Sequence, residues 1–278
     1  MQNIAYINSQ FVIFRDAKIH IEDRGLQFAD SVYEVIAVVN RNLLHFRFHI
    51  KRLKYSLNEL DIQYKFTEKN LLKIFKKLID HNLIRNGIIY LQITRGVQKR
   101  EHAFKKKLKP TVIIYTQKKT FNLPNKNFKG VSVITHEDYR WSRRDIKTTN
   151  LLPNILAENA AHKKKAYTAI LIKNNKITEA AHANIWIVKN NIILTHPSNT
   201  EILKGVTRTV LKEIIKKFKL TLKEKSFTKK QLFNADEIFL TSSGSFVTPI
   251  IKVDSKLINK GKIGNITKYL AHSYFKSF

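Results

Sequence analysis

The sequence contains no cysteine. This absence excludes a disulfide framework, a cysteine nucleophile, a thiolate zinc site and a cysteine-ligated iron–sulfur cluster. With 8 glycines and 5 prolines among 278 residues, collagen-like and proline-rich structures are excluded as well. No apolar run approaches the roughly 20 residues of a transmembrane helix, and the first residues lack the basic stretch and apolar core of a signal peptide. We therefore expect a globular protein of a reducing compartment, most simply the cytoplasm.

Acidic residues are also few. The chain has 51 lysines and arginines against 21 aspartates and glutamates, which gives a formal net charge of +30. A surplus of this size attracts phosphates, so a nucleic-acid-binding protein is one hypothesis. The lysines are spread along the whole chain, however, and are not clustered with aromatic residues, which favours a solvated lysine-rich surface. A hydrophobic content of 43% is typical of a folded chain, and the length allows one large or two medium domains.

Hydrophobic periodicity predicts two α+β domains separated by a polar linker. Residues 119–128 are mostly polar and lack an apolar period, so we assign 1–118 to an N-terminal and 129–278 to a C-terminal domain. In the N-terminal domain, strands and helices are expected at 5–7, 11–14, 31–40, 48–60, 67–79, 87–95 and 111–116. In the C-terminal domain they are expected at 130–135, 154–165, 167–172, 183–188, 207–218, 237–241 and 265–278. An active site between the two domains is the simplest arrangement.

Several common catalytic motifs are absent. The chain has no phosphate-binding loop that ends in Gly-Lys-Ser/Thr, no Gly-x-Gly-x-x-Gly, no His-Glu-x-x-His and no Gly-x-Ser-x-Gly. Its 10 histidines show no metal-ligand spacing, so no metal site is expected. These absences disfavour an ATPase, a nicotinamide-dependent enzyme, a zinc hydrolase and a serine hydrolase.

Short polar clusters at the ends of predicted elements suit a phosphate instead. Gly205-Val206-Thr207-Arg208 opens a predicted helix, whose free backbone N–H groups and threonine hydroxyl are suited to an anion. Thr241-Ser242-Ser243-Gly244-Ser245 ends a predicted strand with hydroxyl groups, and Arg52 follows His49 by one helical turn. Each cluster alone is also explained by a capped helix, a polar turn or a surface arginine. Together they suggest a site for pyridoxal 5′-phosphate.

Three stretches resemble the long signature of the class IV (fold-type IV) pyridoxal-phosphate-dependent aminotransferases. They are Glu179-Ala180-Ala181-His182-Ala183-Asn184-Ile185-Trp186, Ile193-Leu194-Thr195 and Leu203-Lys204-Gly205-Val206-Thr207-Arg208. The resemblance extends over almost the whole chain, from Ile19 to Ile250. Within the family, the sequence looks closest to the D-amino acid (D-alanine) aminotransferases in the stretches 30–35, 100–102 and 145–152.

This resemblance implies a two-domain α+β fold with a barrel-like, cofactor-binding C-terminal domain and the active site between the domains. Lys147 is implied as the catalytic lysine, which forms a Schiff base with pyridoxal 5′-phosphate and moves the proton at the substrate's Cα. Glu179 would face the pyridine nitrogen and keep it protonated. The other implied cofactor-binding residues are Leu203 at the ring and Arg52, Val206, Thr207 and Ser243 at the phosphate.

For the substrate, the resemblance implies a trap for the α-carboxylate that consists of Tyr33, Arg100 and His102. Arginine and histidine two positions apart on an extended segment point to the same side, so we expect both to reach one carboxylate. Relatives specific for branched-chain L-amino acids often have a tyrosine shortly after the lysine, where this sequence has Leu151 and Leu152. This difference favours D-amino acids.

The implied function is transamination between D-amino acids and 2-oxo acids by a homodimer, with D-alanine and 2-oxoglutarate as the reference pair. Two alternatives of the same fold stay open, namely a branched-chain L-amino acid aminotransferase and an aminodeoxychorismate lyase. The sequence also departs from the family pattern. Trp186 stands where Phe or Tyr is usual, and Ala181, His182 and Ala183 replace small hydroxyl residues. None of these departures removes a group that the reaction requires.

Overall fold

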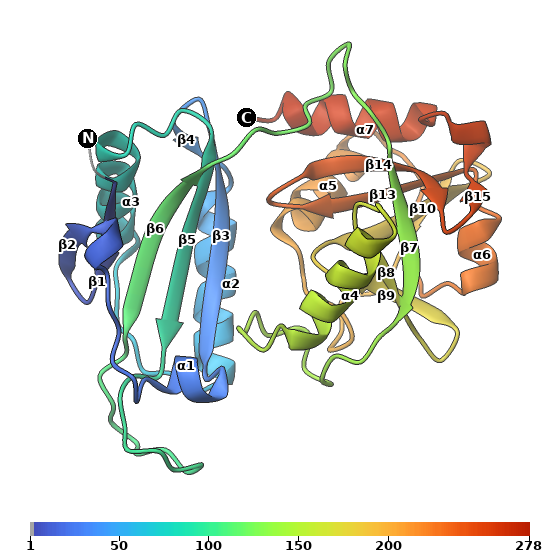
Figure 1. Ribbon diagram of the computed structural model, residues 1–278. Coiled ribbons are helices and arrows are strands. Elements are labelled where there is room, and N and C mark those ends of the chain that lie inside the picture. Colours follow the sequence, from blue (N-terminus) through green and yellow to red (C-terminus); the bar gives the residue numbers. More distant parts are fainter. Residues whose placement is uncertain (1–2) are drawn as a thin grey trace. The chain divides into compact units, whose positions relative to one another are not determined.

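The structure is a computed structural model that describes residues 3–278 (Figure 1). Within this range the chain divides into two compact units. Unit 1 takes the chain up to Thr120 together with Ile146–Asn150, and unit 2 takes Phe121–Asp145 and Leu151–Phe278. The predicted linker, 119–128, contains the first change of unit. The sequence places 146–150 in the C-terminal domain, whereas in the structure these five residues pack with unit 1.

Unit 1 is built on an antiparallel sheet. Among the described residues this sheet has six strands in the order β2-β1-β6-β5-β3-β4. The strands are β1 (Ile4–Ile7), β2 (Gln10–Ile13), β3 (Ser31–Val39), β4 (Asn42–Leu43), β5 (Gly87–Thr94) and β6 (Val112–Lys118). Asn8 and Ser9 join β1 to β2 and both have positive φ, as a two-residue type I′ hairpin requires. The predicted hairpin and the longer strands are thus confirmed.

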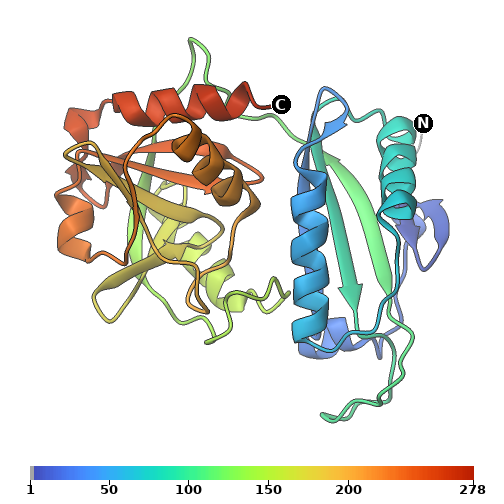
Figure 2. The same ribbon diagram turned by 180° about the vertical axis from the view of Figure 1, so that it is seen from behind.

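One face of this sheet is covered by two helices, α2 (Phe46–Glu59) and α3 (Glu68–His81), as Figures 1 and 2 show from opposite sides. Apolar side chains of both helices pack on strand residues in one core that includes Ile50, Leu53, Leu57, Leu71, Phe75, Leu78, Val32, Ile36, Ile89 and Leu91. Each of these buried side chains stabilises the unit by about 1.5–3 kcal/mol. A shorter helix, α1 (Arg24–Phe28), and a 3-10 turn, η1 (Phe14–Asp16), complete the unit before β3.

Unit 2 contains a larger, mixed sheet. Within the described part of the chain it has nine strands, eight of them in the order β12-β11-β10-β13-β14-β7-β8-β9, with β15 paired to β14. They are β7 (Val131–Glu137), β8 (Ala169–Lys173), β9 (Lys176–Ala180), β10 (Asn184–Lys189), β11 (Ile192–Thr195), β12 (Leu222–Glu224), β13 (Glu237–Ser242), β14 (Phe246–Val253) and β15 (Lys256–Leu257). Only the turn 181–183 separates β9 from β10, and the Ala180 N–H donates to the Ala183 carbonyl. The sheet therefore curls back towards itself.

Helices surround this curled sheet. They are α4 (Leu152–Lys163), α5 (Val206–Lys217), α6 (Lys229–Phe233) and α7 (Asn265–Phe275), with a 3-10 turn η2 (Asn259–Gly261). The core of the sheet is lined mainly by isoleucine, leucine, valine and phenylalanine, among them Ile170, Ile185, Phe227 and Leu240. Every helix found within residues 3–278 is too short or too polar to span a lipid bilayer.

Candidate active site

Lys147 lies in the segment 146–150, which pairs with the beginning of β3 in unit 1. The Lys147 N–H donates to Ser56 Oγ at 3.1 Å, and the Lys147 carbonyl accepts the Tyr33 N–H at 3.0 Å. The next residue, Thr148, forms a bridge with Val32. Lys147 Nζ lies 4.0 Å from the centre of the Tyr33 ring, within the range of a cation–π contact. The structure therefore brings together two predicted site residues, Lys147 and Tyr33.

Arg52, predicted at the phosphate, projects from α2 onto the buried carboxylate of Glu34. Its Nε and Nη2 donate to the two Glu34 oxygens at 2.8 Å each, and His49 Nδ1 lies 2.7 Å from Glu34 Oε2. Burial acts to raise the pKa of Glu34, but Arg52 and His49 together lower it to about 2. Burial also lowers the pKa of His49, so a neutral imidazole donates from Nδ1 to an ionised carboxylate. This arrangement fixes the plane of the Arg52 guanidinium.

Arg100 and His102 lie in a loop after β5 and not on an extended segment, so that expectation is wrong. The backbone bends at Lys99–Arg100 and again at His102–Ala103. The bends arise because the Gln98 side chain binds the loop at two points, donating to the Ala103 carbonyl at 2.8 Å and accepting the Lys105 N–H at 2.9 Å. Both predicted residues still meet at one place. The Arg100 guanidinium carbon lies 4.7 Å and the His102 ring centre 5.6 Å from the Phe28 ring centre.

Glu179 is buried on β9 in unit 2, where three groups donate to its carboxylate. They are the Arg140 guanidinium, Asn184 Nδ2 at 2.9 Å and the Leu203 N–H at 3.2 Å. Burial raises the pKa of Glu179, and the Arg140 guanidinium and the Leu203 N–H act in the opposite direction. Because all three partners are donors, the side chain is arranged as a hydrogen-bond acceptor. The structure also joins Glu179 to Leu203, another predicted site residue.

The first turn of α5 carries Val206 and Thr207, both buried. Gly205 is the N-cap residue and has no side chain that could cap this helix. The first N–H groups of a helix lack intrahelical partners and, with the helix dipole, favour an anion. The predicted opening of a helix by Gly205-Val206-Thr207-Arg208 is confirmed, and the turn has the donor groups that a phosphate needs.

Ser243 lies in the turn between β13 and β14 and is half-buried. The hydroxyl groups of the neighbouring Ser242 and Ser245 lie 2.7 Å apart. One strand away, Trp186 is a fully buried core residue, whose Nε1 donates to Thr241 Oγ1 at 2.9 Å and whose ring stacks on Phe239. The tryptophan that departs from the family pattern is therefore a satisfied packing residue.

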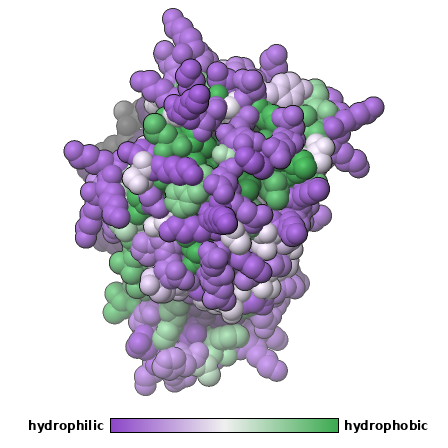
Figure 3. Space-filling view, turned by 90° about the vertical axis from the view of Figure 1, so that its right-hand side faces the viewer, coloured by the Kyte–Doolittle hydropathy of each residue, from purple (hydrophilic) through white to green (hydrophobic). Residues whose placement is uncertain are grey.

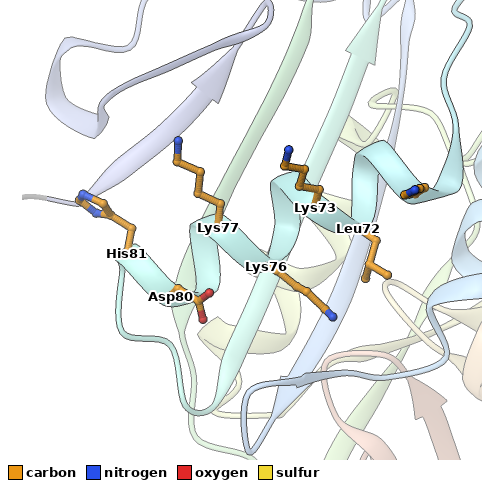
Figure 4. Close-up of a pocket in the computed structure, with 7 residues that line it drawn as sticks. Leu72, Lys73, Lys76, Lys77, Asp80 and His81 are labelled. Atoms are coloured by element: carbon orange, nitrogen blue, oxygen red, sulfur yellow. The ribbon is translucent and has the colours of Figure 1, made fainter.

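A lysine-rich depression on α3 is lined by none of the predicted site residues. This shallow depression of about 730 Å³ lies along α3 and is lined by Lys69, Leu72, Lys73, Lys76, Lys77, Asp80 and His81 (Figure 4). On the face shown in Figure 3, hydrophilic residues cover most of the surface and small apolar groups lie between them. Residues 3–278 contain no group of three or more histidine, cysteine, aspartate or glutamate side chains placed to hold a metal ion.

Residues 31–253 match the family model described as amino-transferase class IV. The chain belongs to the class IV aminotransferases. This class IV aminotransferase is 39% identical to D-alanine aminotransferase of Staphylococcus aureus (strain MSSA476) over 273 residues, which are 98% of this chain and 96% of that protein. It is 40% identical to D-alanine aminotransferase of Bacillus licheniformis over 262 residues, 94% of this chain and 92% of that protein.

Solved structures of the same fold include a putative 4-amino-4-deoxychorismate lyase and branched-chain aminotransferases. The enzyme of Escherichia coli matches with a TM-score of 0.91 at 21% identity, covering 100% of this chain and 95% of that one. The enzyme of Thermoproteus uzoniensis matches with a TM-score of 0.87 at 24% identity, covering 99% and 94%. At these identities the likeness concerns the fold, and it confirms the predicted two-domain α+β architecture of fold-type IV.

The cofactor of class IV aminotransferases is pyridoxal 5′-phosphate, and the residues of this chain fit it. In unit 1, Lys147 offers an amine that forms no ion pair with any carboxylate of residues 3–278. In unit 2, Glu179 offers an acceptor for a protonated ring nitrogen, and the first turn of α5, whose N-cap is a glycine, offers N–H groups for a phosphate. The chemistry of these donors and acceptors is complementary to the three polar parts of the cofactor.

Sequence reasoning missed three residues that hold the site residues in place, namely Glu34, Arg140 and Asn184. Glu34 could have been noticed in the sequence, because it stands among the apolar residues of β3 and a buried carboxylate needs a cation. Asn184 stood inside the quoted motif, but no sequence pattern indicates that its amide lies beside Glu179.

Proposed function

We propose that this class IV aminotransferase transfers amino groups between D-amino acids and 2-oxo acids, with D-alanine and 2-oxoglutarate as the reference pair. The observation that carries the proposal is the identity of 39% to a D-alanine aminotransferase over 98% of the chain. The geometry of the lysine supports it, because the backbone of Lys147 is held on both sides and its amine lies against Tyr33.

We assign the predicted residues the roles of a site for pyridoxal 5′-phosphate and the substrate. Bound pyridoxal 5′-phosphate supplies a carbonyl that takes up and returns an amino group, and a ring that withdraws electrons from the substrate's Cα. In the proposal, Lys147 would take the proton from the substrate's Cα and return it to C4′, the carbonyl carbon of the bound cofactor. Glu179 accepts a hydrogen bond from the protonated ring nitrogen, and Leu203 packs on the ring. The phosphate is bound by Arg52, Val206, Thr207 and Ser243.

The stereochemistry of the proposal depends on where the α-carboxylate is held. Arg100 is suited to this role, because a guanidinium binds a carboxylate through two parallel hydrogen bonds and fixes its orientation. His102 meets the same Phe28 ring, and Tyr33 lies beside Lys147. We propose that these three side chains bind the carboxylate and so determine which hand of the substrate presents its Cα–H to Lys147.

An absorption spectrum tests this function. The purified protein, loaded with pyridoxal 5′-phosphate, should show a near-visible band that bleaches with D-alanine and stays unchanged with L-leucine. A response to L-leucine alone would favour the branched-chain L-amino acid aminotransferase and leave the cofactor assignment intact. Release of pyruvate from aminodeoxychorismate without a 2-oxo acid acceptor would favour the lyase. A protein that takes up no B6 vitamer would refute all three readings.

We also propose a homodimer. On α4, Leu152, Ile155 and Leu156 are spaced to lie on one side of the helix, and they are 64%, 52% and 57% exposed in the single chain. Contiguous exposed apolar side chains of this size are typical of a surface that binds another protein. A second copy of the chain is the partner that the family resemblance implies. We propose a cytoplasmic location as well, which cell fractionation tests.

A further inference from the structure

Asn184 is the first residue of β10 and is buried at the turn that connects this strand to β9. Its backbone lies opposite Thr241 of β13, so the strand pairing fixes the position from which the side chain projects. None of the catalytic or binding roles proposed above uses this amide, although its neighbours include Glu179 and Leu203.

Both amide hydrogens of Asn184 are engaged. Nδ2 donates to Glu179 Oε2 at 2.9 Å and to the Leu203 carbonyl at 2.8 Å. A carboxylate and a carbonyl accept hydrogen bonds and do not donate them, so the amide has one permitted orientation. Its Nδ2 faces these two acceptors and its Oδ1 faces the other way.

The oxygen of the amide lies against Gly205, the N-cap residue of α5. A Cβ atom at Gly205 would be only 2.2 Å from Asn184 Oδ1, so the glycine is what allows the amide to lie there. The φ of −61° and ψ of 139° at Gly205 are open to any residue, and the close approach is therefore the reason for glycine. One side chain thus contacts both the carboxylate of Glu179 and the start of α5.

We propose that Asn184 is a positioning residue that aims the Glu179 carboxylate at the ring nitrogen of the cofactor and sets it relative to the first turn of α5. Without the amide, Oε2 of Glu179 loses a donor while Arg140 still attracts Oε1, so the carboxylate turns towards Arg140. This inference rests on the proposed function, because it needs a pyridine ring nitrogen opposite Glu179.

The test compares two ligands that differ only in the ring nitrogen. Dissociation constants of the apo-protein are measured for pyridoxal 5′-phosphate and for its 1-deaza analogue, in which a C–H group replaces that nitrogen. We expect Asn184→Ala to weaken the binding of pyridoxal 5′-phosphate about tenfold or more and that of the analogue less than about threefold. The reason is that the misplaced Glu179 carboxylate loses its charged hydrogen bond with the ring nitrogen, which the analogue lacks. Gly205→Ala, which keeps the amide but displaces it, should change the ratio of the two dissociation constants in the same direction, because any effect on the phosphate is shared by both ligands.

Asn154→Ala is the matched control. Asn154 is also a partly buried amide of unit 2 that donates to a backbone carbonyl, that of Ala181 at 2.6 Å, but it does not contact Glu179. We expect the ratio of the two dissociation constants to stay at the wild-type value in this variant. Equal weakening of both ligands by Asn184→Ala and by Gly205→Ala would overturn the inference and leave the proposed function standing. A wild-type protein that binds neither ligand would overturn the proposed function, and the inference with it.

Discussion

Several buried charges of this protein lie against a counter-charge. Glu34 has Arg52 and His49, Glu179 has Arg140, and the fully buried Arg208 has Glu224 at 2.7 Å. A buried ion pair adds little to stability as a whole, but the loss of one partner leaves an uncompensated charge in a medium of low dielectric constant. Single substitutions at these positions should therefore have large effects, in contrast to substitutions among the many surface lysines.

Glu34→Gln should lower the free energy of unfolding by about 3–5 kcal/mol, because it leaves the Arg52 guanidinium buried without its counter-charge. Urea denaturation measures the change. The matched control is Glu68→Gln, which removes an exposed carboxylate that pairs with Lys54 and should cost about 1 kcal/mol or less. Equal effects of the two substitutions would show that the Glu34 pair contributes no more than a surface pair.

The lowered pKa of Glu34 predicts that acid destabilises the fold. The pKa lies at about 2 in the folded state, below the ordinary value of 4.5, so the unfolded state takes up the proton first. The stabilisation that this group supplies is present above the unfolded pKa and is lost as the pH falls through the folded pKa. Between pH 5 and pH 2, the free energy of unfolding should therefore fall more steeply in the wild type than in Glu34→Gln. Parallel curves of the two proteins would contradict this expectation.

Lys147→Ala should abolish transamination while the fold is retained, because only the side chain is lost and the backbone bonds to Ser56 and Tyr33 remain. Stopped assays with D-alanine and circular dichroism measure the two properties. A retained wild-type rate would mean that another lysine carries the reaction.

At the scale of the element, the sequence predicted helices better than it predicted the sheet of unit 2. Thr67 was expected to begin a helix and is the N-cap of α3, with its hydroxyl oxygen accepting the Asn70 N–H at 3.2 Å. The strand β14 was not predicted, because Pro249 lies in its middle and proline lacks the N–H group of a central strand. The structure tolerates this proline because the pairing of β14 with β7 begins only at the next residue, Ile250.

The candidate site was predictable only in part, for a related reason. A motif indicates residue types at fixed spacings, so the sequence could nominate Lys147, Glu179 and the first turn of α5. The shape of the loop with Arg100 and His102 depends on local hydrogen bonds of the Gln98 side chain to Ala103 and Lys105, and the contact of Asn184 with Gly205 depends on two elements that are distant in sequence. No motif indicates either contact, because each depends on how the backbone folds around the side chain.

Gly96→Ala tests the loop that carries Arg100 and His102. Gly96 has a φ of +111°, and a Cβ atom there would lie 2.1 Å from the Lys109 carbonyl oxygen, so the loop must move. We expect the KM for D-alanine to rise several-fold, with the affinity for pyridoxal 5′-phosphate unchanged. Gly261→Ala is the control, because Gly261 has a φ of +76° but its Cβ would meet only Leu257 at 3.7 Å or more. Its KM should equal that of the wild type.

At the scale of the whole molecule, the exposed apolar side of α4 predicts the oligomeric state. Leu156→Glu places a charge among Leu152 and Ile155 and should convert a dimer into a monomer, as measured by light scattering after gel filtration. Leu257→Glu is a matched control, since Leu257 is 56% exposed, against 57% for Leu156, but lies on β15. Dissociation by both substitutions, or by neither, would show that α4 is not the contact between subunits.

Because the segment 146–150 belongs to unit 1, the chain passes between the two units three times. The chain leaves unit 1 at Thr120, returns for five residues and leaves again, so no single peptide bond divides the protein into its two parts. A fragment that ends at Thr120 would lack Lys147, the proposed catalytic lysine, and would leave the backbone of Ser31 and Tyr33 at the margin of β3 without the partners that 146–150 provides. Fragments made by cutting the chain at the linker should therefore fold poorly. A chimaera that exchanges one whole unit with a relative needs at least three junctions.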